Sequence, residues 1–145
     1  MFSQDFKEFI ELLNKNKIEY LVVGGYAVGI HGYPRYTGDI DIWIKISNEI
    51  ADKMVTVLDE FGFGGYEIKR EDFLNSNNVI QLGYPPLRID IIMFIDGVNF
   101  EESYSKRVEK VIDGTPINFI GFEELIKNKR ASGRDKDIID LKNLT

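Results

Sequence analysis

The stretch Val23-Gly24-Gly25, followed by Asp39-Ile40-Asp41-Ile42, decides the fold and the chemistry that this sequence predicts. Side chains alternate along a strand, so Asp39 and Asp41 share one face while Ile40 and Ile42 point into the core. Two carboxylates at this spacing repel each other and raise each other's pKa, so we expect a positive group between them. Hard carboxylate oxygens suit Mg²⁺, and a glycine pair lets backbone N–H groups approach a phosphate. The stretch therefore predicts a metal-dependent nucleotide site.

Composition narrows the class of protein further. The chain has 145 residues, 43% of them hydrophobic, which predicts one globular domain over residues 1–145. The absence of cysteine excludes a disulfide framework, a thiolate nucleophile and a cysteine-ligated zinc site. No apolar run reaches the ~20 residues that cross a bilayer, so we expect a cytoplasmic protein without a membrane partner.

Charge also limits the partners. The net charge of −6 argues against binding to an extended DNA duplex. Basic residues nevertheless gather near the C-terminus, at Lys127, Lys129, Arg130, Arg134 and Lys136. A small basic patch opposite an acidic metal site suits a nucleotide or the end of an RNA strand.

Periodicity and turn signals predict an α+β fold with a mixed or mainly antiparallel sheet, flanked by helices and closed by a C-terminal helical pair. A catalytic core over 1–96 precedes a hairpin and two helices over 97–145. Asp113-Gly114 favours a two-residue hairpin turn, and Pro116 predicts that the following strand lies at a sheet edge. The expected helices are 3–16, 25–31, 48–61, 122–130 and 136–144, and the expected strands are 19–23, 40–46, 79–82, 88–94, 107–112 and 116–120. Residues 62–78 carry no clear pattern.

A third carboxylate, Asp90, lies in the apolar run 87–94, which is typical of a central strand. An ionised aspartate there is costly unless it is paired or bound to a metal. Asp90 could therefore form a salt bridge with Arg88 or another base. Alternatively, with Asp39 and Asp41, it could hold two Mg²⁺ roughly 3.5–4 Å apart for in-line phosphoryl displacement.

These residues resemble a known family. Val-Gly-Gly followed, after 13 residues, by Asp-Ile-Asp-Ile resembles the pattern of the DNA polymerase beta-like nucleotidyltransferase superfamily. The longer string GGYAVGIHGYPRYTGDIDIWI is similar to its small bacterial members, the minimal nucleotidyltransferases and the abortive-infection or toxin–antitoxin type. The C-terminal string LIKNKRASGRDKDIIDLKNL extends the resemblance.

The resemblance implies a role for each matching residue. Gly24 and Gly25 would bring backbone amides to the β- and γ-phosphates of a nucleoside triphosphate, although many members carry serine at the second position. Asp39 and Asp41 would bind both metal ions, Mg²⁺ or Mn²⁺. Asp90 would bind the ion that activates the acceptor hydroxyl and could receive its proton.

Three further residues are candidate substrate contacts, each with a structural alternative. Arg35 could hold a phosphate or pair with a surface acid, and Thr37 could hydrogen-bond the loop or end a turn. Lys129 shares the inward helical face of Leu125 and Ile126 and matches the lysine of the family's C-terminal motif. It could contact a phosphate or base, or extend to solvent.

The remaining polar and aromatic candidates have structural interpretations. Arg134, Asp137 and Asp140 suit a structural ion-pair cluster between the last two helices. His31, the only histidine, has no evident catalytic partner and suits helix packing. Trp43 shares the face of Asp39 and Asp41 and could stack a base or pack in the core.

The predicted reaction moves an NMP from an NTP to a hydroxyl on a tRNA 3′ end, a protein side chain or a small molecule. The resemblance also implies a toxin–antitoxin or phage-defence role. A second hypothesis is a non-catalytic nucleotide-binding, antitoxin-like module that acts by contact with a partner protein. A third, a phosphohydrolase or nucleotide sensor, is disfavoured by the absence of clustered histidines.

Overall fold

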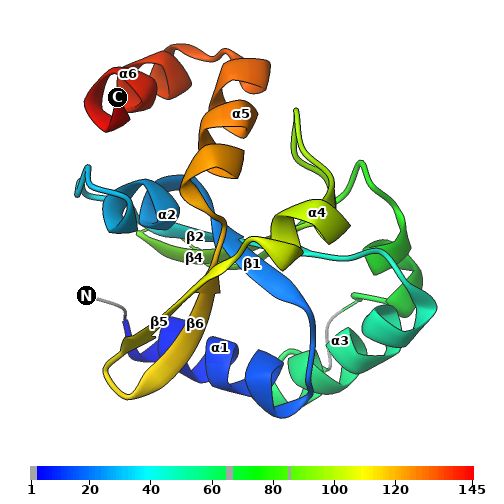
Figure 1. Cartoon of the computed structure of the whole chain (residues 1–145). Helices are drawn as coiled ribbons and strands as arrows, with labels where there is room; N and C mark the ends of the chain where they lie inside the picture. Colours follow the sequence, from blue (N-terminus) through cyan, green and yellow to red (C-terminus); the bar gives the residue numbers. More distant parts are fainter. Residues whose placement is uncertain (1–2, 65–66, 85) are drawn as a thin grey trace.

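The computed structural model describes residues 3–64, 67–84 and 86–145, which form one six-stranded mixed sheet with helices on both faces (Figure 1). The strands are β1 (Tyr20–Val23), β2 (Asp39–Ile44), β3 (Val79–Tyr84), β4 (Leu87–Ile92), β5 (Val108–Ile112) and β6 (Thr115–Phe119). The helices are α1 (Gln4–Lys15), α2 (Gly24–Ile30), α3 (Asn48–Phe61), the 3₁₀ helix η1 (Arg70–Leu74), α4 (Phe100–Ser105), α5 (Phe122–Ser132) and α6 (Asp135–Leu144).

The sheet has the strand order β3-β4-β2-β1-β6-β5. The pairs β1–β2, β3–β4 and β5–β6 are antiparallel, whereas β2–β4 and β1–β6 are parallel. The predicted α+β class with a mixed sheet is confirmed. The parallel β2–β4 pair matters most for function, because it fixes which acidic residues become neighbours.

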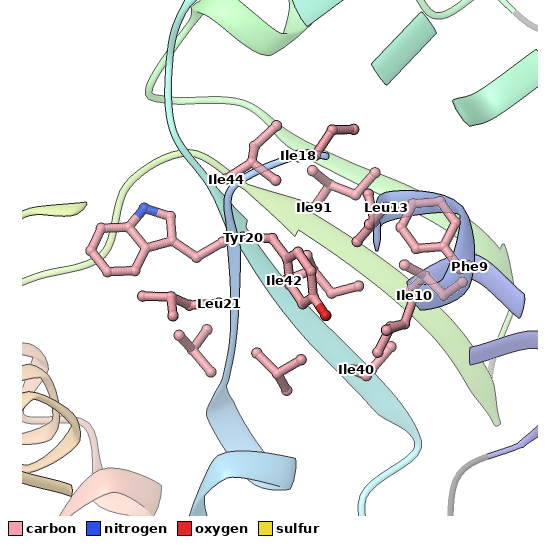
Figure 2. Packing of buried hydrophobic residues seen from close by; sticks show 14 of the residues in the cluster. Phe9, Ile10, Leu13, Ile18, Tyr20, Leu21, Ile40, Ile42, Ile44 and Ile91 are labelled. Carbon is pink, nitrogen blue, oxygen red and sulfur yellow. The ribbon is translucent and has the colours of Figure 1, made fainter. Parts of the chain in front are cut away.

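The main core lies on one face of this sheet. Phe9, Ile10 and Leu13 of α1 contact the layer formed by Ile40, Ile42 and Ile91, and all are fully buried (Figure 2). Alternation then directs Asp39 and Asp41 to the opposite face. Figure 1 shows α1 and α3 on the core side and α5 and α6 on the other.

Local signals fixed the ends of the long helices. Ser3 and Ser47 cap α1 and α3, since each hydroxyl accepts a hydrogen bond from the backbone N–H three residues on. Gly62 ends α3 in the left-handed conformation, with φ of 99°. These boundaries confirm the predicted helices to within a residue or two.

The hairpin turn also forms as predicted, because Asp113 and Gly114 both have positive φ and join β5 to β6. The edge position predicted from Pro116 is wrong, since β6 lies between β1 and β5. Proline is tolerated because β1 pairs with β6 only at Phe119, beyond Pro116. Pro116 therefore faces no strand on the β1 side, and its carbonyl accepts a hydrogen bond from Asn14.

Two elements had no sequence prediction, namely η1 and α4. Strand β3 extends to Tyr84, beyond the predicted end at Leu82, so the connection between β3 and β4 is shorter than expected. Pro85 lies outside the described residues. Within the described part of the chain, no helix is long and apolar enough to span a bilayer.

Candidate active site

Three carboxylates meet on the face of the sheet opposite the main core. The parallel register of β2 and β4 places Asp41 directly beside Asp90 and Asp39 beside Arg88. Residues that pair across neighbouring strands share a face, so all four side chains project the same way. The sequence prediction that these acids come together is consistent with this register.

Arg88 supplies positive charge to this group. Its Nε lies 2.7 Å from Asp90 Oδ1, and its Nη2 lies 2.9 Å from both Asp90 Oδ2 and Asp39 Oδ2. The hydrogen bonds to Asp90 chiefly raise the pKa of Arg88, so the guanidinium stays charged. The salt bridge to Arg88, one of the two alternatives for Asp90, is thus formed.

Among the residues that the structure describes, Asp41 has no such salt-bridge partner. Burial raises the pKa of Asp41 from 3.8 to about 6, and repulsion from the Asp90 carboxylate adds to this effect. Lys136 and Lys129 act in the opposite direction but only offset part of it. Three carboxylates and one arginine leave an excess of negative charge here, which a cation could neutralise.

The glycine pair lies against this acidic group. Gly24 has φ of 66°, and a Cβ built on it would lie 2.2 Å from Asp41 Oδ2. A Cβ on Gly25 would lie 2.8 Å from Thr37 Oγ1 and 3.3 Å from Arg35 Nη1. Both positions therefore exclude any side chain, and at Gly25 the neighbours Thr37 and Arg35 fill the space that a serine would need.

A second charged cluster links the loop before β2 to the C-terminal helices. Lys129 is 3% exposed, and its Nζ lies 2.9 Å from Asp137 and 3.0 Å from Asp140. Arg35 donates two hydrogen bonds of 3.0 Å to Asp140 across 105 residues of sequence. Asp137 also accepts hydrogen bonds from Ser132 and Arg134. The predicted ion-pair cluster of Arg134, Asp137 and Asp140 thus forms, and it also includes Lys129 and Arg35.

The charge state of these acids follows from their partners. Burial alone would raise the pKa of Asp137, but hydrogen bonds from Ser132, Lys129 and Arg134 hold it well below its usual range. Burial of Asp140 is likewise outweighed by Arg35 and Lys129, so its pKa is lowered. Both aspartates are therefore ionised at neutral pH.

A cavity of about 280 Å³ lies between the acids and the C-terminal helices. Its wall includes Gly24, Asp41, Lys129 and Arg134. Gly25, Arg35 and Thr37 line a different cavity, of about 250 Å³, on the other side of the start of α2. The structure therefore divides the predicted substrate-binding residues between two neighbouring cavities.

Whether Asp39, Asp41 and Asp90 suit a metal ion depends on the ligand atoms that they offer. In the described ranges, no three acidic or histidine side chains already converge as a metal cage. Arg88 is bonded to two of the three carboxylates, which explains why they are not free to converge. The third, Asp41, is left with a raised pKa and uncompensated charge, and all three offer hard oxygens. Asp39, Asp41 and Asp90 are thus chemically suited to a divalent ion that displaces or supplements Arg88.

The remaining candidates have structural contacts. His31 lies 2.7 Å from the Ile120 carbonyl and its ring meets Phe122 edge to face, so it packs α2 against α5. Trp43 is buried edge to face against Phe100, which gives it a packing contact. Thr37 donates to the carbonyl of Asp39 and steadies the start of β2.

Two connections were not predicted from the sequence. The link from Asp140 to Arg35 joins distant segments, and no local pattern marks it. The bond from Arg88 to Asp39 also depends on the β2–β4 register. Strand alternation does place Arg88 on the face of Asp90, and that signal pointed to their salt bridge.

Comparison with solved structures shows that the fold is that of nucleotidyltransferases. A candidate nucleotidyltransferase from Thermotoga maritima has a TM-score of 0.65 at 16% identity, over 94% of this chain and 88% of the other. The lincosamide antibiotic adenylyltransferase LnuA, solved with lincomycin, has a TM-score of 0.62 at 20% identity. The match covers 99% of this chain and 96% of LnuA. ANT(2")-Ia, in complex with adenylyl-2"-tobramycin, has a TM-score of 0.58 at 13% identity, over 96% and 84%.

The sequence assigns the family more narrowly. Residues 3–145 match the family described as "Nucleotidyltransferase of unknown function (DUF6036)". The chain therefore belongs to this family of nucleotidyltransferases. No curated protein sequence matches it significantly. The prediction that the chain is a nucleotidyltransferase is confirmed at the level of family and fold, whereas the small bacterial type and a toxin–antitoxin role stay predictions.

The raised pKa of Asp41 predicts a pH-dependent cost to stability. Between pH 3.8 and about 6 the native state binds more protons than the unfolded state, so stability falls as pH rises through this window. Asp41→Asn removes that cost and should raise the free energy of unfolding at pH 7.5 by about 1–2 kcal/mol in metal-free buffer. Urea denaturation at a series of pH values measures the difference, which should vanish below about pH 4. Glu109→Gln, at an exposed strand position, is the control, and equal stabilisation by both variants would contradict the account.

The salt bridge between Arg35 and Asp140 predicts the opposite behaviour. Its contribution to the free energy of unfolding should grow as pH rises, whereas that of Asp41 becomes less favourable. Arg35→Met leaves the buried Asp140 with Lys129 alone and should lower the free energy of unfolding by about 2–4 kcal/mol at pH 7. Since the pKa of Asp140 is lowered in the folded state, this loss should shrink as pH falls below about 4. Lys15→Met, which removes the exposed pair with Glu60, should cost no more than about 1 kcal/mol. Similar losses in the two variants would show that Arg35 is not part of a buried network.

Proposed function

We propose that this protein is a divalent-metal-dependent nucleotidyltransferase that moves an NMP from a nucleoside triphosphate to a hydroxyl acceptor. The observation that carries the proposal is the β2–β4 register, which sets Asp41 beside Asp90 and Asp39 within reach of Arg88, next to a glycine pair that excludes side chains. Membership of a nucleotidyltransferase family supports it.

Each residue then has a defined task. Gly24 leaves its backbone exposed beside Asp41, where the triphosphate would approach. Asp39, Asp41 and Asp90 would hold Mg²⁺ or Mn²⁺, which supplies charge neutralisation at the phosphates and lowers the pKa of a bound hydroxyl. Asp90 would orient the acceptor hydroxyl and receive its proton. The acceptor oxygen forms a bond to the α-phosphorus as the bond to pyrophosphate breaks.

Charged residues next to these groups would contribute to the site. Arg88 is hydrogen-bonded to both Asp90 and Asp39, and a divalent ion would displace or supplement these bonds. Lys129 and Arg134, in the wall of the cavity at Asp41, provide positive charge for the phosphates. Lys129 is held by Asp137 and Asp140, so its charge acts at a fixed position rather than on a mobile arm.

A small-molecule hydroxyl is the acceptor that we favour. The net charge of −6 disfavours RNA, whose phosphates would be repelled. Two structural neighbours are described with lincomycin and with adenylyl-2"-tobramycin, which are small molecules. A tRNA end or a protein side chain is the alternative acceptor.

A contact-only binding module is the competing hypothesis. Arg88 favours it, because the arginine already satisfies Asp39 and Asp90 without a metal ion. The raised pKa of Asp41 argues the other way, since a module without chemistry gains nothing from that uncompensated carboxylate.

The test is transfer of label from α-³²P-labelled NTPs in Mg²⁺ to small-molecule, RNA and protein fractions of a cell extract. We expect label in the small-molecule fraction with matching pyrophosphate release. Asp41→Asn should reduce the rate by about 10³-fold or more, since the metal ligands contribute several kcal/mol to the transition state. Glu109→Gln should retain full activity. Pyrophosphate release no greater than that of Asp41→Asn would contradict a transferase and favour the contact-only module.

A further inference from the structure

Phe94 has an unusual environment for a large apolar side chain. It is the second residue after β4 and is 60% exposed, although Met93 and Ile95 on either side are buried. This alternation continues the pattern of β4, so Phe94 lies on the same side as Asp90. Its phenyl ring therefore lies just beyond the end of the strand that carries the third carboxylate.

The exposed ring forms part of the candidate active site. Phe94 lines the 280 Å³ cavity that also includes Gly24, Asp41, Lys129 and Arg134. One part of this wall is thus acidic, one part is basic, and Phe94 adds a flat apolar surface. A nucleoside triphosphate has matching parts, since its phosphates need cations and its base needs a surface on which to stack.

We propose that Phe94 is the residue on which the nucleobase of the donor triphosphate stacks. This inference rests on the proposed function and adds the nucleoside subsite to it. Stacking on a phenyl ring uses the π-face that every base has, so Phe94 contributes affinity without selecting a base.

The basic residues of the same wall support this orientation. The Arg134 side chain is 72% exposed although its Nε is bonded to Asp137, so most of its guanidinium remains accessible. Lys129, in the same wall, is buried and paired with Asp137 and Asp140. A triphosphate that binds these cations near Asp41 has its base next to Phe94. Within the described chain, Phe94 is the one exposed aromatic residue that lines this cavity.

The experiment compares two ligands by calorimetry in Mg²⁺, α,β-methylene-ATP and inorganic tripolyphosphate. Phe94→Ala should weaken the nucleotide analogue by roughly 5- to 100-fold, the range for loss of one stacked base. Tripolyphosphate affinity should change by less than about twofold, because it has no base. Phe94→Trp should bind the analogue at least as tightly as the wild type. Tyr84→Ala, at an exposed aromatic outside this cavity, should leave both affinities unchanged.

Three outcomes would overturn the proposal. Unchanged binding of the analogue by Phe94→Ala would place the base elsewhere. An equal loss for both ligands would mean that Phe94 supports the phosphate site and not the base. Failure of the wild type to bind either ligand would overturn the proposed function together with this inference, whereas the first two outcomes leave the transferase intact. The melting temperature of Phe94→Ala, expected to be unchanged for an exposed side chain, excludes misfolding as the cause.

Discussion

The parallel pairing of β2 with β4 is the constraint on which the rest of the site depends. It brings two carboxylates, Asp41 and Asp90, side by side in a place where burial makes their repulsion costly. The large apolar core on the opposite face stabilises this pairing, and Arg88 offsets part of the charge. The sheet thus tolerates an electrostatic strain that only a binding site makes useful.

Buried charges, in addition to apolar contacts such as that of Phe122 with His31, attach the C-terminal helices beside the candidate site. Lys129 and Arg35 share Asp140, so this carboxylate of α6 holds both the loop before β2 and helix α5. Such a network is weak evidence for stability, because the cost of burying its charges opposes their attraction. The network does fix where α5 and α6 lie. It therefore fixes the positions of Lys129 and Arg134, which line the cavity at Asp41.

The parts that the sequence predicts are those encoded locally. Strand alternation predicts that Asp39 and Asp41 share a face, the caps Ser47 and Gly62 mark the ends of α3, and Asp113-Gly114 predicts a hairpin. Several features that depend on strand order or on long-range contacts were missed, although the meeting of Asp90 with Asp41 was expected. Pro116 suggested an edge strand because the partial pairing of β6 with β1 cannot be read locally. The contact of Arg88 with Asp39 and that of Arg35 with Asp140 join residues 49 and 105 positions apart.

The central claim is that Asp39, Asp41 and Asp90 together form a divalent-metal site when a nucleotide is bound. Electron paramagnetic resonance of free Mn²⁺, titrated into the protein with α,β-methylene-ATP, tests it most directly because it counts bound ions without requiring an acceptor. The account predicts saturable binding of one Mn²⁺ per chain beyond the ion that the nucleotide itself binds, and loss of this additional ion in Asp90→Asn. No saturable uptake by the wild type, or the same uptake by Asp90→Asn, would contradict it.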